Sequence, residues 1–111
     1  MASEYSYQLT RKALEDLDDA VGYIANKLGS PSSASAFLEK MESALSEICS
    51  YPKIEPSVRN DYLSIHGIRK KAVGNFLLYY LPDEKNQMIT ILRIVYGKRD
   101  TDTILKQLEY Q

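Results

Sequence analysis

Residues 67–96 read GIRKKAVGNFLLYYLPDEKNQMITILRIVY, and this stretch predicts three consecutive β-strands. Residues 68–73 form a charged strand, 76–81 a nearly continuous apolar one, and 88–96 a long strand rich in β-branched residues. Gly74-Asn75 predicts a tight turn, and the polar residues 82–87 predict a hairpin. Successive hairpins indicate antiparallel strands. We expect 76–81 to be central, because it is apolar on both faces.

Toward the N-terminus, residues 5–9 alternate apolar and polar side chains, which predicts a short strand. Thr10 is then placed to cap a helix. An apolar stripe at spacings of three and four predicts that this helix buries Leu14, Leu17, Val21, Ile24 and Leu28. The acidic residues between them are expected on a solvated face: Glu15, Asp16, Asp18 and Asp19. Gly29 ends the helix.

Ser30-Pro31 starts a second amphipathic helix that continues to Tyr51-Pro52. Its inward stripe is expected to be Ala34, Phe37, Leu38, Met41, Ala44, Leu45 and Ile48. Residues 52–66 are predicted as a loop, and 101–110 as an optional final helix. The predicted class is therefore α+β, with the order β-α-α-β-β-β(-α): a helical hairpin packed on one face of a small, largely antiparallel sheet, whose other face stays at least partly exposed.

Composition narrows the classes of function. The chain has 111 residues, 44% of them hydrophobic, and a net charge of −1, which predicts one domain over residues 1–111. A single cysteine, Cys49, and a single histidine, His66, exclude a disulfide framework and Cys- or His-based metal sites, so no cofactor is expected. Without a signal peptide or a membrane-length apolar run, we expect a cytoplasmic protein with no membrane partner.

Charge is nevertheless unevenly placed along the chain. Residues 1–66 carry a net −4 and residues 67–111 a net +3, so the C-terminal part favours a local basic patch. In the first predicted strand of this part, Arg69 and Lys71 point to one face and Lys70 to the other. Two interpretations stay open: an edge strand protected by charge, or a surface that contacts phosphate or carboxylate groups.

Arg93 is the most informative single residue, because an apolar strand surrounds it. A lone arginine there needs either an internal ion pair, for which Asp83 or Asp100 are candidates, or a ligand anion. Tyr96, Lys98 and Arg99 follow at the strand end, where a cation stabilises phosphate and a tyrosine relays a proton. His66 is expected in a solvated loop, and Cys49 at the core or its boundary.

Together the element order and these residues make the chain similar to the RelE/ParE superfamily of bacterial type II toxins. The matching residues are Gly67-Ile-Arg69, Gly74-Asn-Phe76 with the following tyrosines, and Leu92-Arg-Ile-Val-Tyr-Gly-Lys-Arg-Asp100. The resemblance covers most of the chain. It implies a toxin that is neutralised by a tightly bound antitoxin protein, whose C-terminal segment wraps it as a helix or an added strand.

The resemblance also implies one of two targets. RelE-like members cut mRNA in the ribosome, whereas ParE-like members block DNA gyrase without cutting nucleic acid. Here Phe76 stands where RelE-like nucleases place a catalytic arginine, and Tyr96 stands where many relatives have histidine. Lys70 and Lys71 match the nuclease lysines only loosely, which favours the ParE-like branch.

We therefore expect a gyrase inhibitor whose contact surface for target or antitoxin contains Arg69, Lys71, Arg93, Tyr96, Lys98 and Arg99. The alternative is a ribosome-dependent mRNA endoribonuclease, in which Arg93 and Arg99 steady the phosphate and Lys71 or Tyr96 moves protons. Arg99 matches an arginine that the nucleases use, and this keeps the alternative open. A third interpretation is an antitoxin-paired domain that has lost its toxicity.

Overall fold

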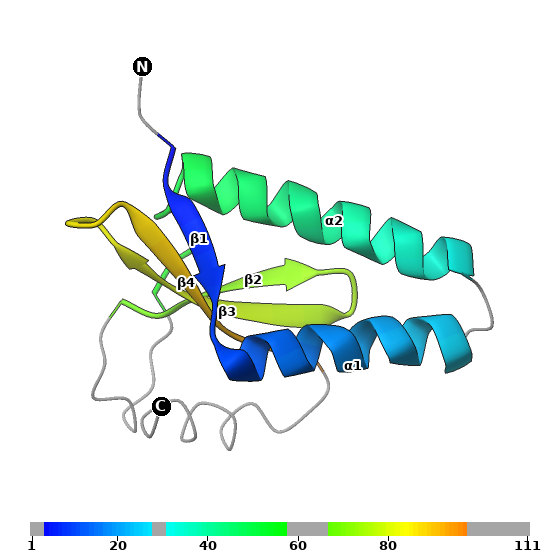
Figure 1. Ribbon diagram of the computed structural model, residues 1–111. Coiled ribbons are helices and arrows are strands. Elements are labelled where there is room, and N and C mark those ends of the chain that lie inside the picture. The colour runs from blue at the N-terminus through cyan, green and yellow to red at the C-terminus, as the bar shows by residue number, and fades with distance from the viewer. Residues whose placement is uncertain (1–3, 28–30, 58–66, 98–111) are drawn as a thin grey trace.

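Two long helices lie across a four-stranded sheet in the computed structural model of the chain (Figure 1). The structure describes residues 4–27, 31–57 and 67–97. Along the chain the elements are β1 (Ser6–Leu9), α1 (Arg11–Lys27), α2 (Pro31–Ser50), β2 (Arg69–Val73), β3 (Phe76–Asp83) and β4 (Met88–Tyr96). This order and the α+β class confirm the sequence-based expectation. The final helix predicted over 101–110 lies outside the described residues.

The strands lie side by side in the order β1-β4-β3-β2, so β3 is internal, as its apolar sequence predicts. The β2–β3 and β3–β4 pairs are antiparallel, whereas β1 pairs in parallel with the first half of β4, from Ser6 opposite Met88 to Leu9 opposite Ile91. Gly74 opens the β2–β3 turn at φ 59°, a left-handed conformation that suits a two-residue hairpin loop. The sheet is therefore mixed, with one parallel edge.

Thr10 caps α1 as predicted: its hydroxyl accepts a hydrogen bond from the Ala13 N–H at 3.1 Å. The buried residues of α1 are Ala13, Asp16, Ala20 and Ile24, so the expected stripe is correct for Ile24. Leu17 and Val21 of that stripe pack partly buried against the core, and Leu28 lies outside the described residues. Leu14 is 53% exposed, and Leu38 on α2 is 42% exposed, so both predictions of burial are wrong. Small side chains at Ala13 and Ala20 bring α1 close against β4 and turn Leu14 outward.

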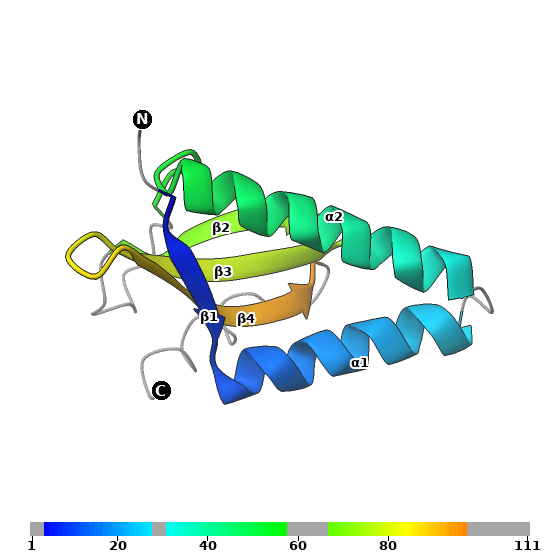
Figure 2. The same ribbon diagram turned by 45° about the horizontal axis from the view of Figure 1, so that its top comes forward.

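Both helices cover the same face of the sheet (Figures 1 and 2), and the larger core lies between them and the strands. It joins Phe37, Met41 and Ile48 of α2 to Leu78 and Ile91 of the sheet. No helix among the described segments has both the length and the hydrophobicity of a membrane span.

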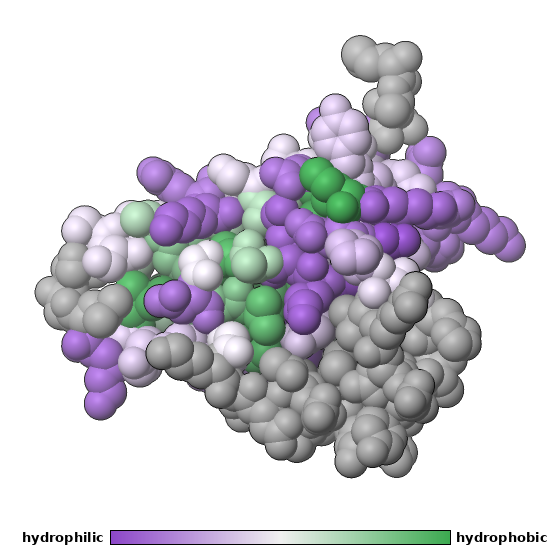
Figure 3. All heavy atoms as spheres, turned by 180° about the vertical axis from the view of Figure 1, so that it is seen from behind, coloured by the Kyte–Doolittle hydropathy of each residue, from purple (hydrophilic) through white to green (hydrophobic). Residues whose placement is uncertain are grey.

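The opposite sheet face carries a second, smaller cluster. Ile68, Tyr79 and Val95 are almost fully buried there, and Leu77, Leu81 and Leu92 pack against them partly exposed. Seen from behind, hydrophobic atoms show in several places among hydrophilic side chains (Figure 3). This face is therefore partly exposed, as predicted.

Candidate functional site

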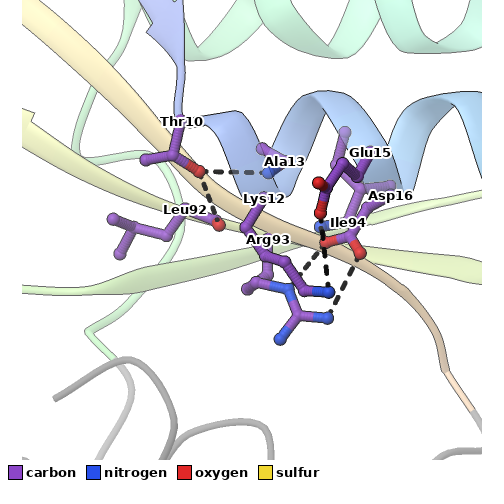
Figure 4. A network of polar contacts seen from close by, with 8 residues as sticks. All are labelled: Thr10, Lys12, Ala13, Glu15, Asp16, Leu92, Arg93 and Ile94. Atoms are coloured by element: carbon purple, nitrogen blue, oxygen red, sulfur yellow. Dashed lines mark hydrogen bonds and ion pairs between the residues drawn. The ribbon is translucent and has the colours of Figure 1, made fainter. Parts of the chain in front are cut away.

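Arg93 and Asp16 form a buried ion pair where α1 crosses β4 (Figure 4). The guanidinium donates from Nε to Asp16 Oδ2 at 2.7 Å and from Nη2 to Oδ1 at 3.2 Å. Arg93 is 3% exposed and Asp16 8%. Two-point contact of this kind fixes the guanidinium plane, and burial protects the pair from water and salt.

The same carboxylate also closes an open sheet edge. β1 ends at Leu9, and beyond it Thr10 binds the free edge of β4. The Thr10 N–H donates to the Ile91 carbonyl, and its hydroxyl donates to the Leu92 carbonyl. One step further along β4, the Ile94 N–H donates to Asp16 Oδ2 at 3.0 Å. Two side chains from the start of α1 therefore continue the hydrogen bonding that β1 begins, as Figure 4 shows.

The internal ion pair was one of the two interpretations of Arg93, but its partner was not foreseen. Asp83 instead accepts hydrogen bonds from Asn86 in its own turn, and Asp100 lies outside the described residues. The assignment of Asp16 to a solvated face is wrong. The apolar stripe at spacings of three and four left Asp16 on the side of the other acids, and only the position of β4 against α1 buries it.

Arg69 and Lys71 share one face of β2, as alternation predicts, and both reach acidic or carbonyl groups. The Arg69 guanidinium donates to the backbone carbonyl of Glu55. Lys71 Nζ contacts Glu47 at 2.7 Å and Glu55 at 3.4 Å, with its side chain 13% exposed. Burial alone lowers the pKa of Lys71, but hydrogen bonds and attraction from both carboxylates leave that pKa above its ordinary value. Lys71 is therefore held as a cation.

The hydroxyl of Tyr80, on the same face of β3, is buried without a hydrogen-bond partner in the described chain. Burial and the negative charge of Glu55 raise the pKa of Tyr80 to about 12. Its phenol therefore stays protonated at neutral pH.

Tyr96 ends β4 inside a row of aromatic rings. The Phe76 ring lies 5.7 Å from Tyr96 and 5.2 Å from Phe37, measured between centroids, in edge-to-face and tilted arrangements. Two hollows, of about 330 and 360 Å³, flank these rings, and both are lined by Tyr23, Phe76 and Tyr96. The sequence singled out Tyr96 but not Tyr23, which is not part of the predicted apolar stripe of the helix.

Lys98 and Arg99, the remaining candidate residues, and His66 lie outside the described residues. Cys49 is buried at the end of α2, as expected, and burial together with Glu4 raises the pKa of its thiol, so the thiolate is disfavoured. In the three described segments, no three His, Cys, Asp or Glu side chains come together as a possible metal site.

The chain as a whole has the architecture of small toxins from bacterial and archaeal toxin–antitoxin systems. It superimposes on the chromosomal ParDE system of P. aeruginosa with a TM-score of 0.63 and 20% identity, covering 86% of this chain and 98% of that one. For the RelBE2 complex of Mycobacterium tuberculosis the TM-score is 0.61 at 20% identity, with coverages of 86% and 94%. A free mutant of E. coli RelE gives 0.61 at 15% identity, with coverages of 95% and 96%. At these identities the likeness concerns the fold.

The family follows from the sequence model that matches residues 7–101, described as the ParE toxin of the type II toxin–antitoxin system parDE. No curated protein matches the chain significantly. The chain belongs to the ParE toxin family, and it is the toxin component of a type II toxin–antitoxin module.

Proposed function

We propose that this toxin arrests growth in the bacterial cytoplasm by inhibiting DNA gyrase, without cutting nucleic acid itself. The observation that supports this most is that the candidate residues on β3 and β4 make contacts inside the protein. Arg93 holds Asp16 in the interior, and Phe76 and Tyr96 pack ring against ring. A nuclease needs a phosphate-binding cation and proton-transferring groups that face one substrate. In the described part of β3 and β4 these positions serve packing and an internal ion pair, which supports binding rather than catalysis.

The contact surface in this proposal centres on Tyr96 and the residues that follow it, Lys98 and Arg99. Arg69 and Lys71 belong to the same proposed surface at its β2 end, where their contacts with Glu47 and Glu55 hold both cations in place. Arg93 contributes by fixing the course of β4 toward Tyr96.

A cognate antitoxin is the second proposed partner. RelBE2 of Mycobacterium tuberculosis and the archaeal RelE–RelB of Pyrococcus horikoshii are toxin–antitoxin complexes of the same fold. The family description also names a two-component system. We infer that the antitoxin covers the surface that otherwise meets the target.

The test is a supercoiling assay with purified gyrase and relaxed plasmid DNA. The wild-type protein is expected to reduce supercoiling in a dose-dependent way, and Tyr96→Ala to weaken this inhibition by about tenfold or more, as loss of a central aromatic contact does at interfaces. Lys85→Ala, an exposed charge in the β3–β4 turn, is the matched control. Unchanged gyrase activity at toxin excess contradicts the proposal.

Primer extension on transcripts from cells that express the toxin alone separates the alternatives. Intact transcripts with growth arrest agree with gyrase inhibition. Cuts within codons that disappear in Arg99→Ala establish the ribosome-dependent nuclease instead. Absence of arrest with folded protein present supports a domain that has lost toxicity.

A further inference from the structure

The α1–β4 hollow, the smaller of the two beside Tyr96, has a lining that combines aromatic rings with the carboxylates of α1. Its volume is about 330 Å³, at the lower end of ligand pockets and suited to one or two side chains. Asp16, Asp19, Ala20 and Tyr23 line it from successive turns of α1. Phe76 and Tyr96 line it from the sheet.

Among the described residues that line this hollow, the charged side chains are both acidic. Asp16 is neutralised by Arg93, so its carboxylate is not available to a ligand. Asp19 is exposed and makes no ion pair or hydrogen bond with other described residues. Asp18, its neighbour, adds a second exposed carboxylate on the same helix without lining the hollow. A ligand therefore meets one unpaired negative charge at the rim.

The rings supply the other half of a cation site. Tyr23 is 52% exposed, and it faces the hollow together with Phe76 and Tyr96. Aromatic faces attract guanidinium and ammonium groups, most strongly where water is partly excluded. The alkyl stem of a lysine or arginine packs on Ala20 and Ile94 while its charged end stays near water.

We propose that this hollow binds a basic side chain, lysine or arginine, of the antitoxin, with Asp19 as the charged partner and Tyr23 and Tyr96 as the aromatic walls. This rests on the proposed antitoxin partner and adds to it a residue that determines specificity. The occupant follows from charge and shape together: an acidic partner side chain is repelled by Asp19, and a purely apolar one gains nothing from its charge.

The first experiment titrates the full chain with acetyl-Leu-Arg-Leu-amide and with the same peptide carrying citrulline, which keeps the shape of arginine but has no charge. Amide chemical shifts are expected to move around Asp19, Tyr23 and Tyr96, with about fivefold tighter binding of the arginine peptide at low salt. Asp19→Asn should remove this preference, and Tyr23→Ala should weaken binding of the arginine peptide. Asp18→Asn, which makes the same change of net charge on the same helix, should leave the preference intact.

Equal binding of both peptides, shifts elsewhere, or equal effects of Asp18→Asn and Asp19→Asn overturn the proposal. A second measurement concerns the source of the side chain: the affinity for the antitoxin encoded beside the toxin gene should fall about fivefold in Asp19→Asn and not in Asp18→Asn. An unchanged antitoxin affinity overturns the assignment even if the peptide binds. Neither measurement involves gyrase, so the proposed target is tested separately.

Discussion

Removal of the Asp16 carboxylate should destabilise the toxin far more than removal of any exposed acid on the same helix. Asp16→Ala removes the two hydrogen bonds that the buried Arg93 guanidinium donates to this carboxylate, and it also leaves the Ile94 N–H unpaired at the sheet edge. Breaking a buried ion pair by removing one partner costs about 3–5 kcal/mol, and a buried unpaired N–H costs about 1–3 kcal/mol. The two losses overlap because water enters the same space, so we expect a total of about 4 kcal/mol.

A loss of that size is a large part of the ~5–15 kcal/mol that stabilises an ordinary domain. It should lower Tm by roughly 15 °C for a chain of this length. Asp18→Ala is the control, because Asp18 is exposed on the same helix, and its effect should stay within about 0.5 kcal/mol. Urea unfolding followed by far-UV circular dichroism measures both variants.

The double variant Asp16→Leu/Arg93→Met tests whether the loss of stability in Asp16→Ala comes from breaking the ion pair. It removes both charges and keeps apolar volume, while the Ile94 N–H is still left unpaired. We expect the double variant to be more stable than Asp16→Ala, with a coupling free energy of at least about 2 kcal/mol between the two positions. Additive effects, or a loss below about 1 kcal/mol in Asp16→Ala, would refute the reasoning.

Three further predictions concern single contacts. Tyr80→Phe should leave stability at pH 7 unchanged or raise it by up to about 1 kcal/mol, because the buried hydroxyl has no partner in the described chain. The folded-state pKa of Tyr80, about 12, lies above the ordinary value of 10, so its contribution to stability is complete below pH 10 and is lost as pH rises toward 12. The Phe variant should lack this alkaline loss in urea titrations at pH 8 and 11, and equal losses in both proteins would contradict the assignment. Lys71→Met should cost about 1–2 kcal/mol by unfolding, because it leaves two carboxylates without their shared cation, whereas the exposed Lys70→Met should be neutral. Thr10→Ala should cost about 1 kcal/mol in thermal melts through loss of the cap and of the bond to Leu92, and Thr10→Ser, which keeps the hydroxyl, should restore most of it.

The sequence predicted most of the fold because local signals agree there. The period-two and apolar patterns of 69–96, the Gly74 turn, the Thr10 cap and the Pro31 helix start each depend on neighbours in the chain. The same holds for the central position of β3, because a strand apolar on both faces has to be covered on both. The family resemblance rests on these local motifs as well.

The pairing of Arg93 with Asp16, the exposure of Leu14 and the hollow beside Tyr23 depend on contacts between residues far apart in the chain. Periodicity predicts the most apolar face of an isolated helix, but α1 is oriented so that Ala13, Asp16 and Ala20 are buried on the side of β4. Their small or hydrogen-bonded side chains permit a closer approach than leucine does. The sequence by itself thus determined the elements, their order and the protein's family. The tertiary structure decided which acid of α1 is buried and which stays exposed. The reason is that a carboxylate is stable in the interior only where a cation and a backbone N–H bind it.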